Sequence, residues 1–397
     1  MNKKILALVL ALALMVVCFA GCNNSKNDTP KTPDVQSEGN GELPVLTIGG
    51  IGPLTGQVAV YGTAVRNGIQ IAADMLNETA EERGYKIVVD FQDDEGDAEK
   101  AVNAYNLIKD NGAKLLIGTV TTAPCLAVNE YSVLDNMFQI TPSGSALDCT
   151  RYDNGFRVCF TDPGQGVAAA QYIAANGLAS SVAVIYDSSD AYSSGIYQAF
   201  IEEAAAQNLS VVVEEAFTAD SKTDFSVQLQ KVQESGAELL FLPIYYQEGA
   251  LILQQASQMG IEIPVFGADG FDGILDQLGA DNAALAEGVM LMTPFVATKD
   301  DAQTQNFVNT YADLYNGEVP NQFAADGYDA VIAIAKCFDS NPEMVNASIS
   351  DVCEFLKEQM TEISIEGLTG NITWSSDGEP TKEPIVVKIT NGAYEVL

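Results

Sequence analysis

The chain has 397 residues, and 47% of them are hydrophobic, which is enough to fill the cores of one large domain or two medium ones. Its formal net charge of -35 should repel nucleic acid phosphates and anionic lipid surfaces, so no nucleic acid partner is predicted. Histidine is absent, which removes the commonest general base near neutral pH and every histidine-bearing triad or metal site. The cysteines show no metal-ligand spacing either. The composition therefore argues against an enzyme and predicts neither a metal nor a cofactor.

The N-terminus has the pattern of an export signal. A basic start, MNKK, precedes the apolar run ILALVLALALMVVCFA, and the small residues Ala20 and Gly21 stand before Cys22. This arrangement resembles a bacterial lipobox and predicts a signal peptide over residues 1–21 with lipidation of Cys22; an ordinary signal peptide or a single membrane anchor is the alternative. Residues 22–44 are rich in Asn, Ser, Pro and Gly and predict a flexible tether. We expect an extracytoplasmic protein that is lipid-anchored to the bacterial cell membrane.

From residue 45 onward, short apolar runs alternate with amphipathic helical stretches. Strand-like runs rich in Val, Ile, Leu and Phe occupy residues 45–50, 86–92, 114–118 and 137–141. Between the first two, apolar residues recur at helical spacing on one face from Val65 to Leu76. The alternation predicts an α/β protein whose parallel sheet is covered by helices on both faces.

The same rhythm restarts after residue 160, with strand-like runs at 181–187, 210–217, 238–244 and 263–269. The total is too long for one modest sheet, so we expect two doubly wound parallel-sheet lobes joined by hinge strands. The predicted N-terminal lobe comprises residues 45–161 plus 294–372. The predicted C-terminal lobe comprises residues 162–293 plus 373–397.

In open α/β sheets, ligands lie beyond the carboxyl ends of the strands, so the strand-to-helix turns are informative. The first turn, within GGIGPLTGQVAVYG, contains no lysine or arginine and matches neither glycine-rich phosphate-binding pattern. The turns GTVTTAP and TPSGSA present hydroxyls at Thr119, Thr121, Thr122, Ser143 and Ser145. Hydroxyls and helix N–H groups form a neutral receptor for a carboxylate, although any single one of these residues is more simply explained as a helix cap.

The turns of the second lobe have a different character. They offer the aromatic residues Tyr192, Tyr245 and Tyr246 and the acid Asp269, a combination that suits an ammonium group. All four arginines precede residue 158, so the second lobe lacks the fork that usually binds oxyanions. One lobe for a carboxylate and the other for an amine is what an α-amino acid requires.

Five cysteines follow Cys22, an odd number that cannot all pair within one chain. Cys149 and Cys159 bracket a turn-containing span that a disulfide could close, and buried free thiols are the equal alternative.

Together, these segments resemble the leucine/isoleucine/valine-type substrate-binding proteins of ABC importers, which have the type I periplasmic-binding fold. The resemblance rests on ordered segments that include GPLTGQVAVYG, DDEGDAEKAV, LIGTVTTAP, ITPSGSA, FRVCFTDPGQG, YDSSDAYSSG and FGADGFDG. It implies a hinged closure of two lobes on a free amino acid, branched-chain or otherwise aliphatic, and delivery to an ABC transporter permease. Relatives that bind amides, urea or aromatic acids keep the ligand class open.

The resemblance also implies roles for particular residues. It places Tyr61 in the pocket, Thr122, Ser143 and Ser145 on the ligand's carboxylate, Tyr192 and Tyr245 among the second-lobe aromatics, and Asp269 opposite the α-ammonium group. Relatives often have glutamate where this chain has Asp269, and Thr121 replaces one cysteine of the family's early disulfide.

Two other classes of function remain as alternatives. An exported α/β enzyme would have to use the acidic run Asp93, Asp94, Glu95 and Asp97, which is more typical of a solvated turn than of a catalytic pair. A ligand-binding module of a sensor would need a separate signalling partner.

Overall fold

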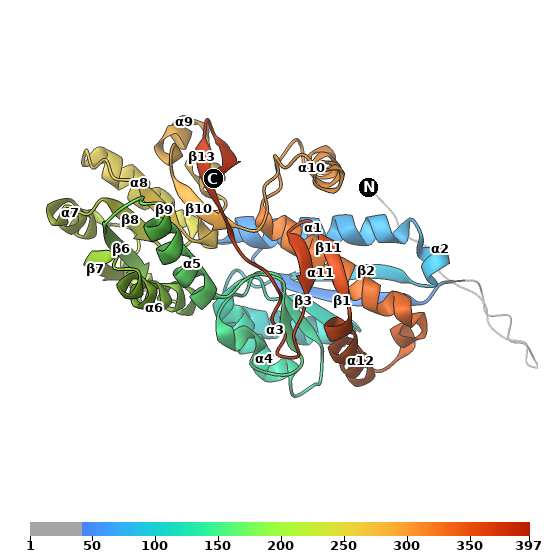
Figure 1. Ribbon diagram of the computed structural model, residues 1–397. Coiled ribbons are helices and arrows are strands. Elements are labelled where there is room, and N and C mark those ends of the chain that lie inside the picture. Colours follow the sequence, from blue (N-terminus) through green and yellow to red (C-terminus); the bar gives the residue numbers. More distant parts are fainter. Residues whose placement is uncertain (1–41) are drawn as a thin grey trace, which may run out of the picture. The chain divides into compact units, whose positions relative to one another are not determined.

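The computed structural model describes residues 42–397, which form two α/β lobes (Figure 1). The predicted signal peptide, the predicted lipidation site at Cys22 and nearly all of the predicted tether lie outside the described residues. Within residues 42–397, no helix combines the length and the apolar character needed to cross a membrane.

The first lobe is built on a five-stranded sheet in the order β2-β1-β3-β4-β5, with every neighbouring pair parallel. Its strands are β1 (Val45–Gly52), β2 (Lys86–Asp93), β3 (Leu115–Gly118), β4 (Gln139–Thr141) and β5 (Gly155–Arg157). Its helices are α1 (Ala59–Asn77), α2 (Ala80–Arg83), α3 (Ala98–Asp110), α4 (Thr122–Ser132) and the 3₁₀ helix η1 (Leu147–Thr150).

The second lobe is built on a seven-stranded sheet in the order β14-β13-β10-β9-β8-β6-β7. Its strands are β6 (Ser181–Asp187), β7 (Ser210–Phe217), β8 (Leu239–Leu242), β9 (Val265–Gly267), β10 (Met290–Thr293), β13 (Ile385–Thr390) and β14 (Ala393–Val396). Its helices are α5 (Asp162–Ala175), α6 (Ala191–Ala206), η2 (Ala219–Ser221), α7 (Ser226–Ser235), α8 (Tyr246–Gln258), η3 (Asp269–Phe271), α9 (Ile274–Asn282) and η4 (Ala283–Ala286).

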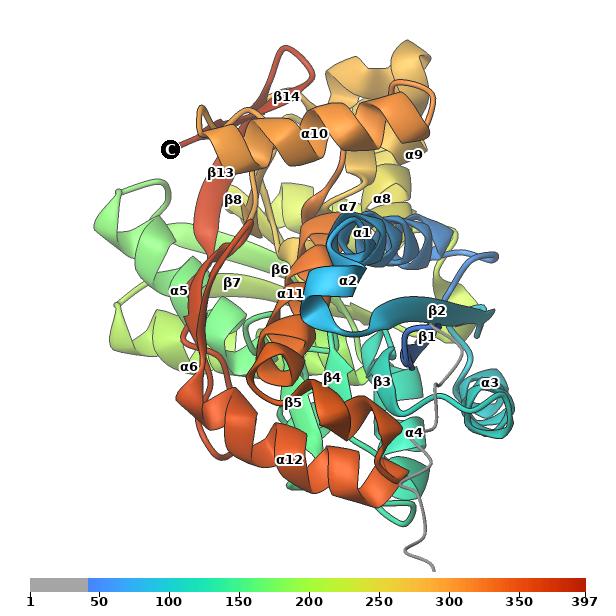
Figure 2. The same cartoon turned by 90° about the vertical axis from the view of Figure 1, so that its right-hand side faces the viewer.

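The last third of the chain supplies elements to both lobes. It contains α10 (Ala302–Leu314), α11 (Gln322–Ser340), η5 (Pro342–Asn346), α12 (Ile349–Glu362) and the hairpin β11 (Ser364–Gly367) with β12 (Gly370–Thr373). Helix α11 packs along α1 of the first lobe. The chain then passes as a long extended segment from β12 to β13 of the second lobe, which Figures 1 and 2 show in red.

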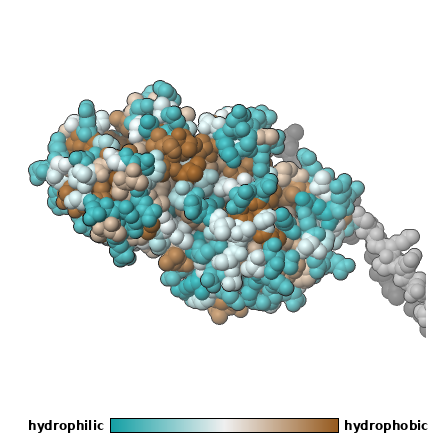
Figure 3. Space-filling model, viewed as in Figure 1, coloured by the Kyte–Doolittle hydropathy of each residue, from teal (hydrophilic) through white to brown (hydrophobic). Residues whose placement is uncertain are grey.

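Each sheet is buried on both faces, which explains why its strands read as continuous apolar runs. In β3, Leu115 and Ile117 pack into the cluster that contains α1 and α11, whereas Leu116 packs into the cluster that contains α3 and α4. In β8, Leu240 faces α7 and α8, while Phe241 faces α5 and α6. The doubly wound architecture predicted from the sequence is confirmed. The face in Figure 3 is largely teal or white, with separate brown hydrophobic areas.

The second sheet is not entirely parallel. Strand β13 runs antiparallel to β10 and to β14, and the hairpin between β13 and β14 turns at Asn391 and Gly392. Both turn residues have positive φ angles, 51° and 76°, as a type I′ turn requires. The Asn-Gly pair therefore explains why β14 runs antiparallel to β13.

Two glycines allow the close approach of α1 and α11. A Cβ atom on Gly68 would lie 1.9 Å from the carbonyl oxygen of Ala324, and one on Gly327 would lie 2.6 Å from that of Val65. The two helix backbones therefore touch directly. This contact fixes the start of α11, which lies beside the cavity described next, against the first lobe.

Candidate functional site

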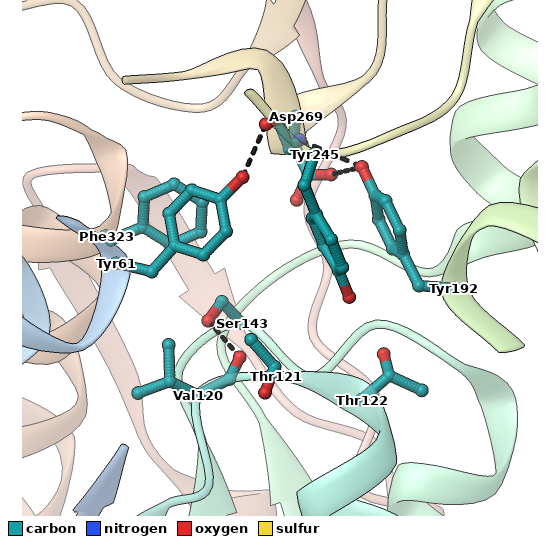
Figure 4. A pocket seen from close by; sticks show the side chains of 10 residues that line it. Tyr61, Val120, Thr121, Thr122, Ser143, Tyr192, Tyr245, Asp269 and Phe323 are labelled. Atoms are coloured by element: carbon teal, nitrogen blue, oxygen red, sulfur yellow. Dashed lines mark hydrogen bonds between the residues drawn. The ribbon is translucent and has the colours of Figure 1, made fainter. Parts of the chain in front are cut away.

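A small cavity lies where loops of the two lobes meet (Figure 4). About 240 Å³ of space lies between the atoms that line it, and this figure includes the solvent at its mouth. The lining residues are Tyr61, Val120, Thr121, Thr122, Ser143, Tyr192, Tyr245, Asp269, Gly270 and Phe323. The loops that follow β3, β4, β8 and β9 supply most of them, as expected for the carboxyl ends of parallel strands.

The cavity brings together six of the seven residues that the sequence predicted as ligand-binding: Tyr61, Thr122, Ser143, Tyr192, Tyr245 and Asp269. The seventh, Ser145, is buried in the same loop as Ser143 but does not line the cavity. Sequence reasoning missed Val120, Gly270 and Phe323. Val120 and Gly270 stand next to predicted residues, whereas Phe323, at the start of α11, lies more than fifty residues away from any of them and carried no comparable signal.

The first-lobe wall of the cavity is the N-terminal end of α4. The N-cap residue, Thr121, makes no side-chain capping hydrogen bond, whereas α3, α5 and α6 are each capped by a side chain. The hydroxyls of Thr121 and Thr122 are buried and have no hydrogen-bond partner among the described residues. The helix-cap interpretation therefore fails for Thr121. Because the first N–H groups of a helix also lack partners within the helix, this wall offers uncharged donors to an anion.

The adjacent loop after β4 is held from behind by a buried cation. Arg157 is fully buried, and its guanidinium group donates hydrogen bonds to the carbonyl oxygens of Gly144, Ala146 and Leu147 at 2.9 to 3.1 Å. The hydroxyl of Ser143 donates to the carbonyl oxygen of Val120 at 2.6 Å, so its proton is already engaged. The hydroxyl of Ser145 has no partner among residues 42–397.

The opposite wall carries a buried carboxylate. Asp269 is only 4% exposed, and its Oδ1 accepts a hydrogen bond from the Tyr192 hydroxyl at 2.7 Å. The Tyr192 hydroxyl also accepts one from the Gly270 N–H at 2.9 Å. Burial raises the pKa of Asp269 to about 6, although its hydrogen bonds oppose the shift. Among the described residues, no lysine or arginine lies within ion-pair distance of Asp269.

Gln165 and Gln322 hold the backbone of Asp269 in place. The amide oxygen of Gln165 accepts from the Asp269 N–H at 3.0 Å, and the amide nitrogen of Gln322 donates to the Asp269 carbonyl at 2.8 Å. Because Gln165 is on α5 and Gln322 is on α11, two separate helices fix the position of the carboxylate.

Aromatic rings form the sides of the cavity. Tyr192 and Tyr245 stack with their centroids 4.8 Å apart and their planes within 7° of parallel. The ring centroid of Tyr61 lies 4.2 Å from that of Phe323 and 5.8 Å from that of Tyr245, to which Tyr61 is packed edge-on. The faces of such rings attract cations. The rings can also pack against a hydrocarbon side chain of a ligand.

Direct hydrogen bonds join the two lobes around the cavity. The hydroxyl of Tyr61, on α1, donates to the carbonyl oxygen of Gly270 in the second lobe. The hydroxyl of Tyr246, at the start of α8, donates to the carbonyl oxygen of Gln57 in the first lobe at 2.9 Å. The lobes are thus in contact, and residues of both line the cavity between them.

The acidic run that an enzyme would have to use lies elsewhere. Asp93 accepts hydrogen bonds from the N–H groups of Leu54 and Thr55, and Asp97 caps α3. Neither these residues nor Asp94 and Glu95 line the cavity. Within residues 42–397, no cluster of acidic and cysteine side chains could hold a metal ion.

Two α/β lobes that meet over a small cavity, with hydroxyls and helix N–H groups on one wall and a carboxylate on the other, define a class of protein: the two-lobed receptors for small solutes. The chain belongs to the periplasmic binding protein family, whose model matches residues 45–393. Membership of this family places the chain outside the cytoplasm.

Curated relatives cover most of the chain. It is 29% identical over 336 residues to Leu/Ile/Val-binding protein homolog 3 of Brucella melitensis, and the aligned region covers 84% of this chain and 88% of that protein. It is 26% identical over 330 residues to the leucine-, isoleucine-, valine-, threonine- and alanine-binding protein of Pseudomonas aeruginosa, covering 83% and 85% of the two chains.

Solved structures of solute-binding proteins also resemble this chain. The branched-chain amino acid transporter substrate-binding protein LivJ of Streptococcus pneumoniae, in complex with isoleucine, superposes with a TM-score of 0.80 at 26% identity, covering 89% of this chain and 99% of that one. A solute-binding protein of Rhodopseudomonas palustris in complex with benzoate has a TM-score of 0.78 at 21% identity, covering 89% and 95%. At that identity the second likeness shows the fold alone.

Proposed function

We propose that this chain is the solute-binding component of an ABC importer and that it closes its two lobes on a free α-amino acid. The observation that carries the proposal is that a carboxylate lies on one wall of the cavity and unpaired hydrogen-bond donors lie on the other. Asp269 is a buried carboxylate with no cationic partner among residues 42–397, and it lies across the cavity from the uncapped start of α4 (Figure 4). A zwitterion satisfies both walls at once.

In this proposal the ligand's ammonium group binds the Asp269 carboxylate and the ring faces of Tyr192 and Tyr245. Its carboxylate takes hydrogen bonds from the N-terminal N–H groups of α4 and from the hydroxyls of Thr121 and Thr122. To donate to the ligand's carboxylate, the Ser143 hydroxyl would give up its hydrogen bond to the carbonyl oxygen of Val120. Ser145 supports the loop from behind the cavity wall. Enclosure strengthens each of these polar contacts, because no bulk water competes for them.

The side chain of the ligand is aliphatic in this proposal. Val120, Phe323 and the ring of Tyr61 are the apolar groups of the lining, and no charged lining residue besides Asp269 is available to a polar side chain. Relatives named for leucine, isoleucine and valine support the same choice.

Binding of an aromatic acid, an amide or urea is the second candidate. The aromatic rings of the cavity favour it, since the stacked Tyr192 and Tyr245 could accept a flat ligand. A ligand of this kind carries no cation, however, and would enclose the Asp269 carboxylate without a partner, which is costly in a buried site. The zwitterion is therefore the better fit.

Calorimetry with matched ligands tests the proposal. We expect leucine or isoleucine to bind, and we expect 4-methylpentanoate, which lacks the ammonium group, and 3-methylbutylamine, which lacks the carboxylate, each to bind at least about a hundredfold more weakly. Asp269→Ala should abolish binding while circular dichroism shows an unchanged fold. Equal affinity for leucine and 4-methylpentanoate would rule out the zwitterion site.

We further propose how the protein is attached and divided. The signal peptide spans residues 1–21, Cys22 carries the lipid, residues 22–44 tether the lobes to the membrane, and the closed form is what the permease recognises. The lobes comprise residues 45–161 plus 294–372 and residues 162–293 plus 373–397. Cell fractionation tests the anchor: Cys22→Ala should move the protein from the membrane fraction to the soluble fraction, and retention in the membrane would contradict lipidation at Cys22.

A further inference from the structure

Two of the cysteines lie together behind the cavity wall. The five cysteines of the described residues are buried free thiols. A Cβ atom placed on Gly144 would lie 3.3 Å from the Cβ of Cys125 and also 3.3 Å from the Sγ of Cys149. Both cysteines therefore border the same side of Gly144, which lies between Ser143 and Ser145. Cys159, which the sequence offered as the partner of Cys149, is not part of this contact.

Secondary structure brings these cysteines together from different elements. Cys125 is in the first turn of α4, where its N–H donates to the carbonyl oxygen of Thr121. Cys149 is in η1, and Asn129 of α4 donates to its carbonyl oxygen at 3.0 Å. The amide of Asn129 thus holds η1 against α4, and the Sγ of Cys125 lies 3.9 Å from the Oδ1 of the same amide.

The surroundings favour thiol chemistry at this pair. The neighbouring Cys149 thiol lowers the pKa of Cys125 and the nearby Arg157 cation lowers it further, whereas burial opposes the shift. The Cys125 thiol and burial raise the pKa of Cys149. One thiol of the pair is thus prepared to act as the thiolate and the other to remain protonated, which is the arrangement that thiol–disulfide exchange uses.

We propose that Cys125 and Cys149 form a disulfide that cross-links α4 to η1 when the chain folds outside the cytoplasm. The inference rests on this geometry and on the extracytoplasmic location of the family, where disulfides form and persist. It does not depend on which ligand the cavity binds.

The oxidant is a low-molecular-weight or protein disulfide. The Cys125 thiolate attacks one of its sulfur atoms, and the other sulfur leaves as a thiolate that takes up a proton. The thiolate of Cys149 then attacks the Cys125 sulfur in the mixed disulfide and expels the second sulfur as a thiol. The protein loses two protons and two electrons, and the oxidant gains both.

The cross-link would close a loop of about 25 residues that contains the end of α4, β4 and the Ser143–Ser145 turn. Because a closed loop restricts the unfolded chain, we expect the oxidised protein to melt roughly 5 °C or more above the reduced one. The same bond would hold the hydroxyl-bearing turn against the start of α4.

The distribution of lysine and arginine allows a direct test by mass spectrometry. Trypsin cleaves after Lys114 and Arg151, so residues 115–151 form one peptide that contains both Cys125 and Cys149. Cys159 falls in a different tryptic peptide, residues 158–222. The full chain is folded in a mixture of reduced and oxidised glutathione and is then denatured in the presence of iodoacetamide, which alkylates free thiols. The alkylated protein is digested with trypsin either directly or after reduction.

We expect the unreduced 115–151 peptide to carry no alkyl group and to be lighter by two hydrogen atoms than the reduced peptide, while Cys337 and Cys353 are alkylated. Cys125→Ser should leave Cys149 alkylated and remove the gain in melting temperature, whereas Cys159→Ser should change neither. Alkylation of both cysteines in the unreduced 115–151 peptide would overturn the proposal. A disulfide that joins this peptide to residues 158–222 would overturn it as well.

Discussion

The affinity for an amino acid should depend on pH in a way that reports on Asp269. Burial raises the pKa of this carboxyl group to about 6 in the empty site. An ammonium ligand binds the ionised form, so binding favours the carboxylate and lowers its pKa. Affinity should therefore be greatest above pH 6 and fall as the pH drops through that value.

The size of the effect follows from the same pKa. Near pH 7.5 almost all of the Asp269 carboxyl groups are ionised, whereas about one in eleven is ionised at pH 5, so the Kd should rise about tenfold between the two. An aspartate with an ordinary pKa near 4 would produce almost no change over this interval. The free amino acid keeps both of its charges throughout the range and does not contribute.

Calorimetry at pH 7.5, 6 and 5, in buffers with different ionisation enthalpies, measures both the Kd and the protons released on binding. We expect close to one proton to be released per ligand at pH 5 and almost none at pH 7.5. The control is Asp94→Asn, because Asp94 is another buried acid whose pKa is raised, to about 7, but it lies outside the cavity. A Kd that stays constant from pH 7.5 to pH 5, or a pH dependence that disappears in Asp94→Asn, would refute the reasoning.

Three further predictions concern single side chains. Thr122→Val removes a hydroxyl that has no partner among the described residues, so the melting temperature should hardly change while the Kd rises roughly tenfold; a large loss of stability with unchanged Kd would mean a structural role. Tyr61→Phe removes the hydrogen bond to Gly270 that joins the lobes and should raise the Kd up to roughly tenfold, whereas no change would show that this bond does not favour closure. Asp269→Asn should stabilise the ligand-free protein by up to about 3 kcal/mol in urea unfolding at pH 7, because a carboxyl group with a raised pKa destabilises the fold above that pKa. The gain in stability should vanish below pH 4, and no gain at pH 7 would contradict the burial argument.

The fold could be predicted largely because its strands are buried on both faces. A run such as Leu115–Ile117 must be apolar throughout when both faces of the sheet carry helices, and helical spacing between such runs then implies a parallel sheet. The hairpin from β13 to β14 was not predicted, although its signal, the Asn-Gly pair at 391–392 between two strand-like runs, is present in the sequence.

The candidate site was partly visible for a related reason. Strand-to-helix turns come together at one edge of a parallel sheet, so Thr122 and Ser143 could be grouped on the first sheet and Tyr245 and Asp269 on the second. That the two groups face each other was implied only by the family resemblance. Phe323 could not be grouped in this way, because it reaches the cavity through the packing of α11 on α1, which depends on close backbone contacts at Gly68 and Gly327.

The exposure of Ser145 could not be read from the sequence either. Two serines separated by one glycine look equivalent in TPSGSA, but the carbonyl oxygens of this loop are drawn towards Arg157 behind it. The turn therefore presents Ser143 to the cavity and buries Ser145.

A crystal structure of the protein grown with leucine or isoleucine tests the central claim most directly. It should place the ligand between the lobes, with its nitrogen within hydrogen-bond distance of the Asp269 carboxylate and its carboxylate at the N-terminus of α4 beside Thr121 and Thr122. A ligand bound outside this cavity, or bound inside it with its two charged ends reversed, would contradict the account.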